Sequence, residues 1–476
     1  MSYLDNINFK NSFGALSNEF YTKQNWSPLP KAKLVNFNYD LAEELGLKNV
    51  DPKALVKIFN GEISLENTDP LAMVYAGHQF GNWVPQLGDG RGILFGQIET
   101  SNGLKDLHIK GAGKTPYSRF GDGRAVLRSS IREYLCGEAM HGLKIPSSRS
   151  LIIFTGEEPV FRETTEPGAM MVRSASTHIR FGNFEYFYYK NDSENLKKLI
   201  DYCFDTYSEF TECDGSIKKL FSKIVDSTAS MIASWQALGF CHGVMNTDNF
   251  NIFGETFDYG PFAFLEDYNP NFICNLSDTS GRYSYANQPY IGLWNCSALG
   301  QAFSNFLSQS EIEDTLKYYE KIFSKKLLIN FKNKLGLTSS EEGDPDLIQA
   351  FLDILHKKNL DFTKSFRDLE NVIKKESPTS KDEELRQWQI SFLKRHDKDS
   401  ISLNKKIRII SSSNPIITPK NFQIDKVNMK AEEGDFSTMK KMLDAFKDPF
   451  IKDDLTSKFS LPPKNDEKNK RLSCAS

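Results

Sequence analysis

The alternation of apolar and polar residues changes its period along the chain. Residues 93–99 and 104–110 are short apolar runs on either side of Asn102-Gly103. Asn-Gly is a strong signal for a tight hairpin turn, because both residues tolerate the left-handed backbone that such a turn requires. The sequence therefore predicts an antiparallel pair of strands.

Longer segments show the spacing of amphipathic helices. Between residues 125 and 141, apolar side chains return every four positions, and Gly142 follows as a stop signal. A similar pattern over residues 221–238 ends at Gly239. After about residue 340, helix-like stretches alternate with polar segments rich in Ser, Pro and charge. They predict a helical C-terminal extension that ends in a mobile polar tail.

Composition and charge argue against several classes of protein. The 476 residues include 59 Lys and Arg and 62 Asp and Glu, a formal net charge of −3, which does not suit a protein that coats nucleic acid. No apolar run reaches the ~18 residues of a membrane helix, and the N-terminus lacks the features of a signal or transit peptide. The seven cysteines form no Cys-x-x-Cys pair. We expect a cytoplasmic monomer that binds neither nucleic acid nor membrane.

The candidate chemistry begins at the glycine-rich segment 88–92, directly before the first predicted strand. Glycines let backbone N–H groups approach phosphate oxygens, and the arginine in this segment adds a charged fork. Lys110 ends the second predicted strand, and Glu133 lies on the helix that follows. This order matches the small lobe of a protein kinase, in which a Lys–Glu pair holds the nucleotide phosphates. Taken alone, the same residues also fit a plain turn and a surface ion pair.

A second group of candidate residues follows the helix that ends at Gly239. His242 precedes Asp248-Asn249, and Asp258 begins an Asp-Tyr-Gly segment ten residues later. Protein kinases carry a His-x-Asp catalytic loop and then Asp-Phe-Gly, whose Asp holds magnesium. Here the His is displaced from the Asp, and the Asn adjoins it. Asp–Asn pairs also cap turns, so it is the order of all five parts that supports a kinase-like interpretation.

These elements predict an α+β, protein-kinase-like two-lobed fold with a β-rich small lobe, a helical large lobe and a helical C-terminal extension. Residues 1–75 are expected to be an N-terminal segment that packs on the small lobe. We place the small lobe at 76–185 and the large lobe, with the catalytic and metal residues, at 186–340. The extension and the mobile tail then occupy 341–476.

Five long blocks around these residues resemble the selenoprotein O family (SelO or YdiU), kinase-like protein adenylyltransferases, and in particular its cysteine-containing bacterial members. They cover most of residues 75–300, whereas the last 130 or so residues carry little of the resemblance. The blocks are GHQFGNWVPQLGDGRG (77–92), KGAGKTPYSRFGDGRAVLRSSIREYLCGEAMHGLKIP (110–146), VRSASTHIRFGNFE (172–185), HGVMNTDNFNIFGETFDYGPFAF (242–264) and SDTSGRYSYANQPYIGLWN (277–295).

The resemblance implies that AMP moves from ATP to Ser, Thr or Tyr hydroxyls of proteins and that pyrophosphate leaves. In this family the nucleotide lies flipped relative to ordinary kinases, so that its α-phosphate meets the acceptor. The resemblance further implies that Asp248 is the proton acceptor, that Asn249 and Asp258 hold Mg²⁺ or Mn²⁺, and that Glu133 pairs with Lys110. The residues it implies for nucleotide binding are Gly88, Gly90, Arg91, Lys110, Asp122, Gly123, Arg173, Arg180 and Asp258.

The resemblance also implies a redox role for the C-terminal tail. Cys474 is the third residue from the end, where the family carries a terminal Cys or selenocysteine. A disulfide from Cys474 to Cys274 would tie the tail across the segment that gates acceptor access. In a reducing cytosol this bond would be transient and regulatory. A free thiol on the tail is the alternative, and the sequence leaves both open.

Two other functions stay open at this point. A kinase that transfers the γ-phosphate would release ADP in place of pyrophosphate. A pseudokinase scaffold would bind nucleotide, or only a partner, without chemistry. The displaced His242 favours the scaffold, but the presence of Asp248, Asn249 and Asp258 argues against it.

Overall fold

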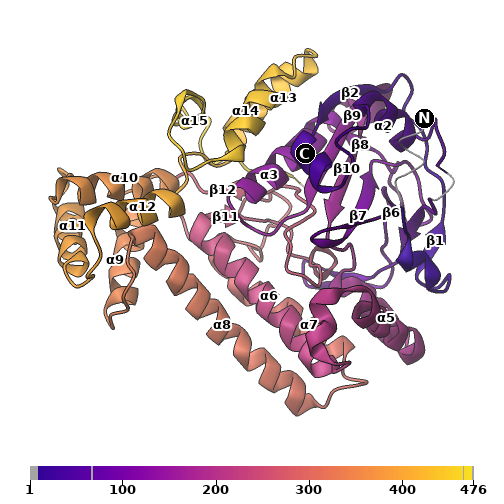
Figure 1. The fold of residues 1–476 in the computed structure, drawn as a ribbon, viewed down its shortest axis with the longest axis horizontal. Coiled ribbons are helices and arrows are strands. Elements are labelled where there is room, and N and C mark those ends of the chain that lie inside the picture. Colours follow the sequence, from indigo (N-terminus) through magenta and orange to yellow (C-terminus); the bar gives the residue numbers. More distant parts are fainter. Residues whose placement is uncertain (1–8, 66–67, 465, 474–476) are drawn as a thin grey trace.

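An antiparallel sheet of eight strands forms the small lobe of the computed structural model, which describes residues 9–65, 68–464 and 466–473 (Figure 1). The predicted hairpin is present as β6 and β7, joined at Asn102-Gly103. A separate two-stranded hairpin pairs β4 (Gly77–Gln79) with β5 (Asn82–Val84). In spatial order the sheet comprises β1 (Tyr21–Lys23), β3 (Leu71–Met73), β6 (Gly92–Thr100), β7 (Gly103–Lys110), β10 (Thr165–Ala175), β9 (Arg149–Phe161) and β2 (Lys33–Phe37), with β8 (Ala125–Val126) beside β10.

Helices cover both faces of this sheet, which explains why β6 is buried at successive positions. On one face, Phe95 and Ile109 pack with residues of α1 (Tyr39–Glu44) and α2 (Pro52–Phe59). On the other face, Leu94 and Met171 pack with α3 (Leu127–Gly142). The N-terminal segment therefore does more than pack on the small lobe, because it supplies β1, β2 and β3 to the sheet itself.

The boundaries of α3 differ from the sequence prediction at both ends. The helix begins at Leu127 because Ala125 and Val126 pair with β10 as a short strand. Gly142 is its last residue and not a stop after it. A Cβ at Gly142 would lie 1.9 Å from the backbone oxygen of Phe446. The glycine is thus required for close packing against the C-terminal extension.

The large lobe consists of helices, which confirms the predicted α+β two-lobed fold. The predicted second helix is α6, and Gly239 closes it with a φ of 75°. Helix α6 lies beside α8 and contacts α7 (Figure 1). The helices of this lobe are α4 (Phe181–Tyr189), α5 (Ser193–Thr206), α6 (Ile217–Leu238), α7 (Gln288–Ala302) and α8 (Gln309–Leu335), with a small pair of strands, β11 (Phe240–Cys241) and β12 (Ala263–Phe264).

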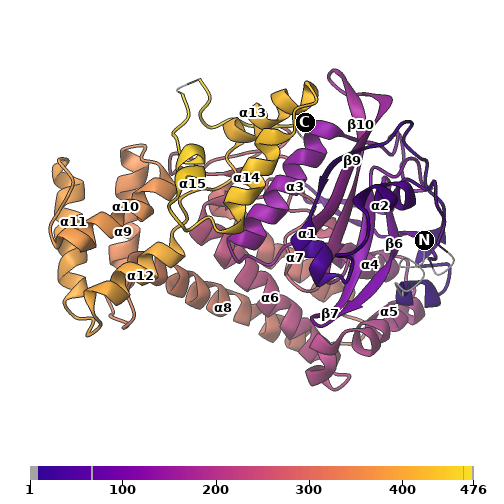
Figure 2. The same cartoon turned by 45° about the horizontal axis from the view of Figure 1, so that its top comes forward.

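The C-terminal extension has two parts. Helices α9 to α12 gather at the far end of α8, away from the sheet (Figure 1). Helices α13 to α15 lie nearer the sheet, and α13 and α14 pack against α3 (Figure 2). The seven helices are α9 (Asp344–Lys357), α10 (Phe362–Lys375), α11 (Glu383–His396), α12 (Leu403–Ser413), α13 (Asn421–Glu432), α14 (Ser437–Lys447) and α15 (Asp454–Phe459).

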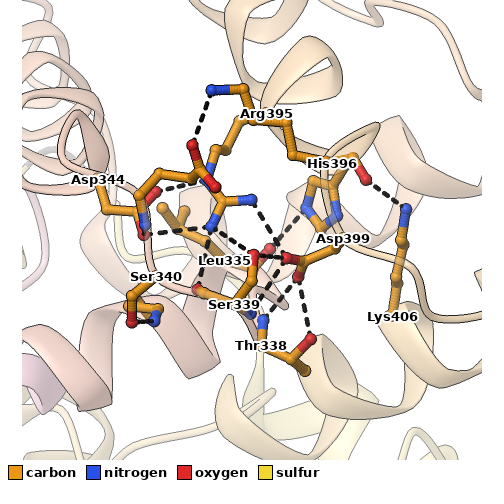
Figure 3. Close-up of polar contacts among 12 residues, drawn as sticks. Leu335, Thr338, Ser339, Ser340, Asp344, Arg395, His396, Asp399 and Lys406 are labelled. Carbon is orange, nitrogen blue, oxygen red and sulfur yellow. Dashed lines mark hydrogen bonds and ion pairs between the residues drawn. The ribbon is translucent and has the colours of Figure 1, made fainter.

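A charged cluster ties the connection between α8 and α9 to the end of α11 (Figure 3). The carboxylate of Asp399 accepts the backbone N–H groups of Thr338 at 2.6 Å and Ser339 at 3.1 Å. Arg395 binds both Asp399, at 3.2 Å, and Asp344, at 2.5 Å. Burial raises the pKa of Asp399, but hydrogen bonds from Ser339 and Thr338 and the Arg395 guanidinium outweigh it and hold this pKa well below its usual range. This cluster is a structural clamp.

The described part of the tail contacts the body of the protein through its backbone. Leu472 donates its N–H to the Cys274 carbonyl at 3.0 Å and accepts the Leu276 N–H at 2.7 Å. Asn421 on α13 donates to the backbone oxygen of Lys470 at 3.0 Å.

Over the described ranges, the helices lack the combined length and apolar character that crossing a bilayer requires.

Candidate active site

The glycine-rich segment 88–92 forms one wall of a cavity between the lobes. Gly88 has a φ of 139°, and a Cβ there would lie 2.4 Å from the ring of Tyr117. Gly123, in the facing loop, has a φ of 74° and would place a Cβ 2.1 Å from the backbone of Gly113. Only glycine fits either position, because the ring of Tyr117 and the backbone of Gly113 lie directly against the two residues.

Lys110, at the end of β7, forms an ion pair with Glu133 on α3. Glu133 also accepts from Arg173 on β10 at 3.1 Å. Burial lowers the pKa of Lys110 to about 8, although Glu133 opposes this shift. The strands β7 and β10 thus place two cations, Lys110 and Arg173, against the single carboxylate of Glu133 on α3.

Asp258 lies at the centre of the cationic group. Arg173 and Arg180 each pair with one of its carboxylate oxygens. Burial raises the pKa of Asp258, but Arg180, Arg173 and Lys110 outweigh it and hold this pKa well below its usual value. Asp258 also has a φ of 58°, a left-handed conformation that is uncommon outside glycine. Backbone strain of this kind is typical of functional sites.

Asp248 lies in a short 3₁₀ turn, Thr247–Asn249, on the opposite wall. Its Oδ2 accepts from the side-chain amide of Gln79 at 3.2 Å, while its buried Oδ1 has no hydrogen-bond partner. Arg180 donates to the backbone oxygen of Asp248 at 2.6 Å. Burial raises the pKa of Asp248 to about 6, with Arg180 and Gln79 opposing the shift. An unpartnered oxygen with this pKa is suited to accept a proton near neutral pH.

These walls enclose a cavity of about 510 Å³. That volume lies within the usual range for sites that bind small molecules and cofactors. Glu133 stands behind Lys110 and does not line the cavity. The predicted residues that line it are Gly88, Gly90, Arg91, Lys110, Asp122, Gly123, Arg173, Arg180, Asp248, Asn249 and Asp258.

The structure adds residues that sequence reasoning missed. Gln79 on β4 reaches Asp248, although 169 positions separate them. Arg162, between β9 and β10, pairs with Asp122 at 2.7 Å and also lines the cavity. The block 77–92 contained the signal for Gln79, but nothing in its local pattern showed that β4 lies against the turn Thr247–Asn249. No local pattern marked Arg162.

Cys274 is buried, and its Sγ lies 3.3 Å from the Sγ of Cys241. Burial raises the pKa of Cys274 well above its usual value. Cys474, its expected partner, lies outside the described residues. The sequence did not indicate Cys241 as a neighbour of this thiol.

The two lobes, the Lys110–Glu133 pair and the carboxylates at 248 and 258 define a nucleotide-binding transferase of the protein-kinase-like class. The family model described as "Protein adenylyltransferase SelO" matches residues 3–447, and the chain belongs to this family. The match extends well beyond the residues that carry the resemblance in the sequence, and includes most of the C-terminal extension.

Curated relatives are similar to the chain over its full length or nearly so. A "Protein nucleotidyltransferase YdiU" of Vibrio atlanticus (strain LGP32) is 41% identical over 491 residues, covering 100% of both chains. The protein of the same name from Aliivibrio fischeri (strain MJ11) is 42% identical over 487 residues, again covering 100% of both. That of Enterobacter sp. (strain 638) is 41% identical over 467 residues, covering 96% of this chain and 97% of its own.

Proposed function

We propose that this protein is a metal-dependent adenylyltransferase that moves AMP from ATP to Ser, Thr or Tyr hydroxyls of other proteins and releases pyrophosphate. Family membership supports the reaction class. The observation that carries the assignment of the site is the carboxylate of Asp248, whose buried Oδ1 has no hydrogen-bond partner, in the lining of a cavity that Lys110, Arg173 and Arg180 also line.

In the proposed reaction, the acceptor oxygen forms a bond to the α-phosphorus while the bond from that phosphorus to the bridging oxygen breaks. The acceptor proton passes to the carboxylate of Asp248, and pyrophosphate leaves with the bridging oxygen. The cationic residues Arg91, Lys110, Arg173 and Arg180 stabilise the charge that develops on the leaving group. Glu133 acts as a positioning residue that holds Lys110.

The residues at the proposed metal site have the donors that Mg²⁺ or Mn²⁺ prefers. Asn249 donates its Nδ2 to the backbone oxygen of Val244 at 2.9 Å, which commits its amide nitrogen and leaves Oδ1 for a cation. Asp258 adds carboxylate oxygens. Mg²⁺ is usually held by one or two protein oxygens together with substrate phosphates. When bound, such an ion would neutralise phosphate charge.

Arg173 and Arg180 have a second proposed role. In the structure they neutralise Asp258. Phosphate oxygens are equally good partners for a guanidinium. When ATP enters, we expect the two arginines to turn to the phosphates, which frees the carboxylate of Asp258 for the cation.

The tail disulfide is also a proposal. Leu472, two residues before Cys474, pairs with the backbone of Cys274, which supports this proposal. A cytoplasmic location and a monomeric state likewise stay predictions. The six described cysteines are all free and buried, which suits a reducing compartment.

The test is to incubate the full chain with ATP and Mg²⁺ and a bacterial lysate, and then to measure the mass added to modified peptides. We expect the mass of AMP, with pyrophosphate as the released product. Added phosphate with release of ADP would show a kinase, and the absence of both would show a scaffold. An Asp248→Asn variant serves as the matched control, because it keeps the size of the side chain and removes the proton acceptor.

A further inference from the structure

The segment 277–295 belongs to one of the blocks noted in the sequence, yet it contributes nothing to the lining of the nucleotide cavity. The segment contacts Asn246, the residue directly before the turn Thr247–Asn249, through the side chain of Tyr283. The hydroxyl of Tyr283 donates to Oδ1 of Asn246 at 2.7 Å and accepts the Phe80 N–H at 2.9 Å. This segment therefore supports the β4–β5 hairpin at the place where Gln79 reaches Asp248.

Arg282, the residue before Tyr283, is held next to the turn of that hairpin. Its guanidinium carbon lies 4.7 Å from the ring centre of Trp294. A Cβ at Gly81 would come within 3.1 Å of the same carbon, so the guanidinium also packs on the hairpin turn. The backbone N–H of Arg282 is fixed by Asp278 at 3.0 Å. The cation is thus placed by contacts from three directions.

Within the described ranges, no carboxylate forms an ion pair with Arg282. Its Nε is buried and has no hydrogen-bond partner. Asp278 is occupied by backbone N–H groups of residues 282 and 283. Arg149, by contrast, binds both Glu138 and Glu44 at 2.7 Å. A partly buried guanidinium without a counter-charge loses hydration and gains little in return, unless a ligand supplies the missing anion.

We propose that Arg282 binds a carboxylate of the acceptor protein, and so selects hydroxyls that have Asp or Glu nearby in the chain. This inference rests on the proposed function. Gln79, which reaches Asp248, and Gly81, which contacts Arg282, are two residues apart. Both residues belong to the β4–β5 hairpin, so the acidic residue of the acceptor falls within a few positions of its modified hydroxyl.

The surroundings of Arg282 suit a protein partner. Phe80, Trp83 and Trp294 are half-buried, and Tyr189 is 45% exposed. The ring of Trp83 lies 4.0 Å from that of Tyr189. Aromatic residues together with arginine are enriched in protein–protein interfaces. The proposed acceptor surface therefore consists of the cation of Arg282 and the aromatic side chains around it, Phe80, Trp83, Tyr189 and Trp294.

The experiment maps AMP-modified sites in a bacterial lysate treated with the full-length protein, ATP and Mg²⁺. Wild type is compared with Arg282→Glu, with Arg282→Gln, and with Arg386→Glu, which alters an exposed arginine on α11 as a control. Within three residues of wild-type sites, we expect Asp and Glu to be enriched about two- to fivefold over the lysate average, the size of effect for one partly exposed ion pair. Arg282→Gln should abolish this preference, Arg282→Glu should reverse it toward Lys and Arg, and Arg386→Glu should keep it.

The outcomes separate this inference from the proposed function. Sites without acidic neighbours in wild type, or an acidic preference that persists in both Arg282 variants, would overturn the inference alone. A loss of ATP affinity in Arg282→Gln, measured by calorimetry, would also overturn it, because the arginine would then bind nucleotide. The absence of AMP on every protein with wild type would overturn the proposed function as well.

Discussion

Replacing Gln79 with leucine removes the only side-chain donor that the described residues place on the carboxylate of Asp248. The amide of Gln79 lies 3.2 Å from Oδ2, and Oδ1 has no partner. Hydrogen bonds to charged groups contribute about 1.5–3 kcal/mol, and a contact of this length belongs at the lower end of that range. Because the same bond orients the base, and about 1.4 kcal/mol of lost orientation corresponds to a factor of ten in rate, we expect kcat for AMP transfer to fall about tenfold.

The same change should move the pH dependence of the reaction. Burial raises the pKa of Asp248 to about 6, while Arg180 and Gln79 oppose the shift. Without the donor from Gln79, the carboxylate is harder to ionise, and its pKa should rise by about one further unit, since one unit corresponds to about 1.36 kcal/mol. Asp248 accepts a proton only when it is ionised. Activity is therefore lost as the pH falls through the pKa, and this acidic limb should move to higher pH in Gln79→Leu.

The assay is the initial rate of AMP incorporation at saturating ATP, recorded from about pH 5 to about pH 8 to span this pKa. ATP affinity, measured by calorimetry, should change little, because the contact is to Asp248 and not to a cation of the cavity. Gln24→Leu is the matched control, since its amide donates to the backbone of Lys114 at an exposed position. An unchanged kcat and acidic limb in Gln79→Leu, or an equal loss in Gln24→Leu, would refute the reasoning.

Four other variants, one of them with a control, test separate parts of the structure. Asp258→Ala should abolish transfer from labelled ATP and lower the Tm, because two buried arginines lose their carboxylate; near-normal transfer would contradict the metal assignment. Lys110→Ala should weaken transfer strongly, whereas Lys105→Ala, which loses a contact to Ser176 outside the cavity, should not, and equal rates would contradict the phosphate role. Arg395→Leu should reduce the free energy of unfolding in urea by about 3–5 kcal/mol, as expected when a buried ion pair loses one partner, with ATP affinity kept as the check that only the clamp is affected. Cys474→Ser should remove any effect of dithiothreitol on activity, and an effect that persists would exclude the tail disulfide.

Local sequence pattern was sufficient for the elements whose signals lie within one segment. The Asn102-Gly103 turn specified the β6–β7 hairpin, and Gly239 ended α6 where the apolar spacing ended. The order of strand, strand and helix predicted the Lys110–Glu133 pair only together with the later segment of Asp248, Asn249 and Asp258, and the structure contains that pair. In these cases, backbone preference and short-range packing agree.

Contacts between distant segments were decided only by the tertiary structure. Ala125 and Val126 have the spacing of the helix that follows them, but pairing with β10 makes them a strand. The polar tail has a composition typical of mobile segments, yet the backbone of Leu472 pairs beside Cys274. Gln79 lies 169 positions before the carboxylate that it contacts. Apolar periodicity and turn residues record the conformation of a segment, whereas the choice of partner depends on packing across the whole molecule. The sequence alone therefore indicated the class of chemistry and predicted residues that line one cavity, and the fold decided which side chains, such as Gln79, support the carboxylate of Asp248.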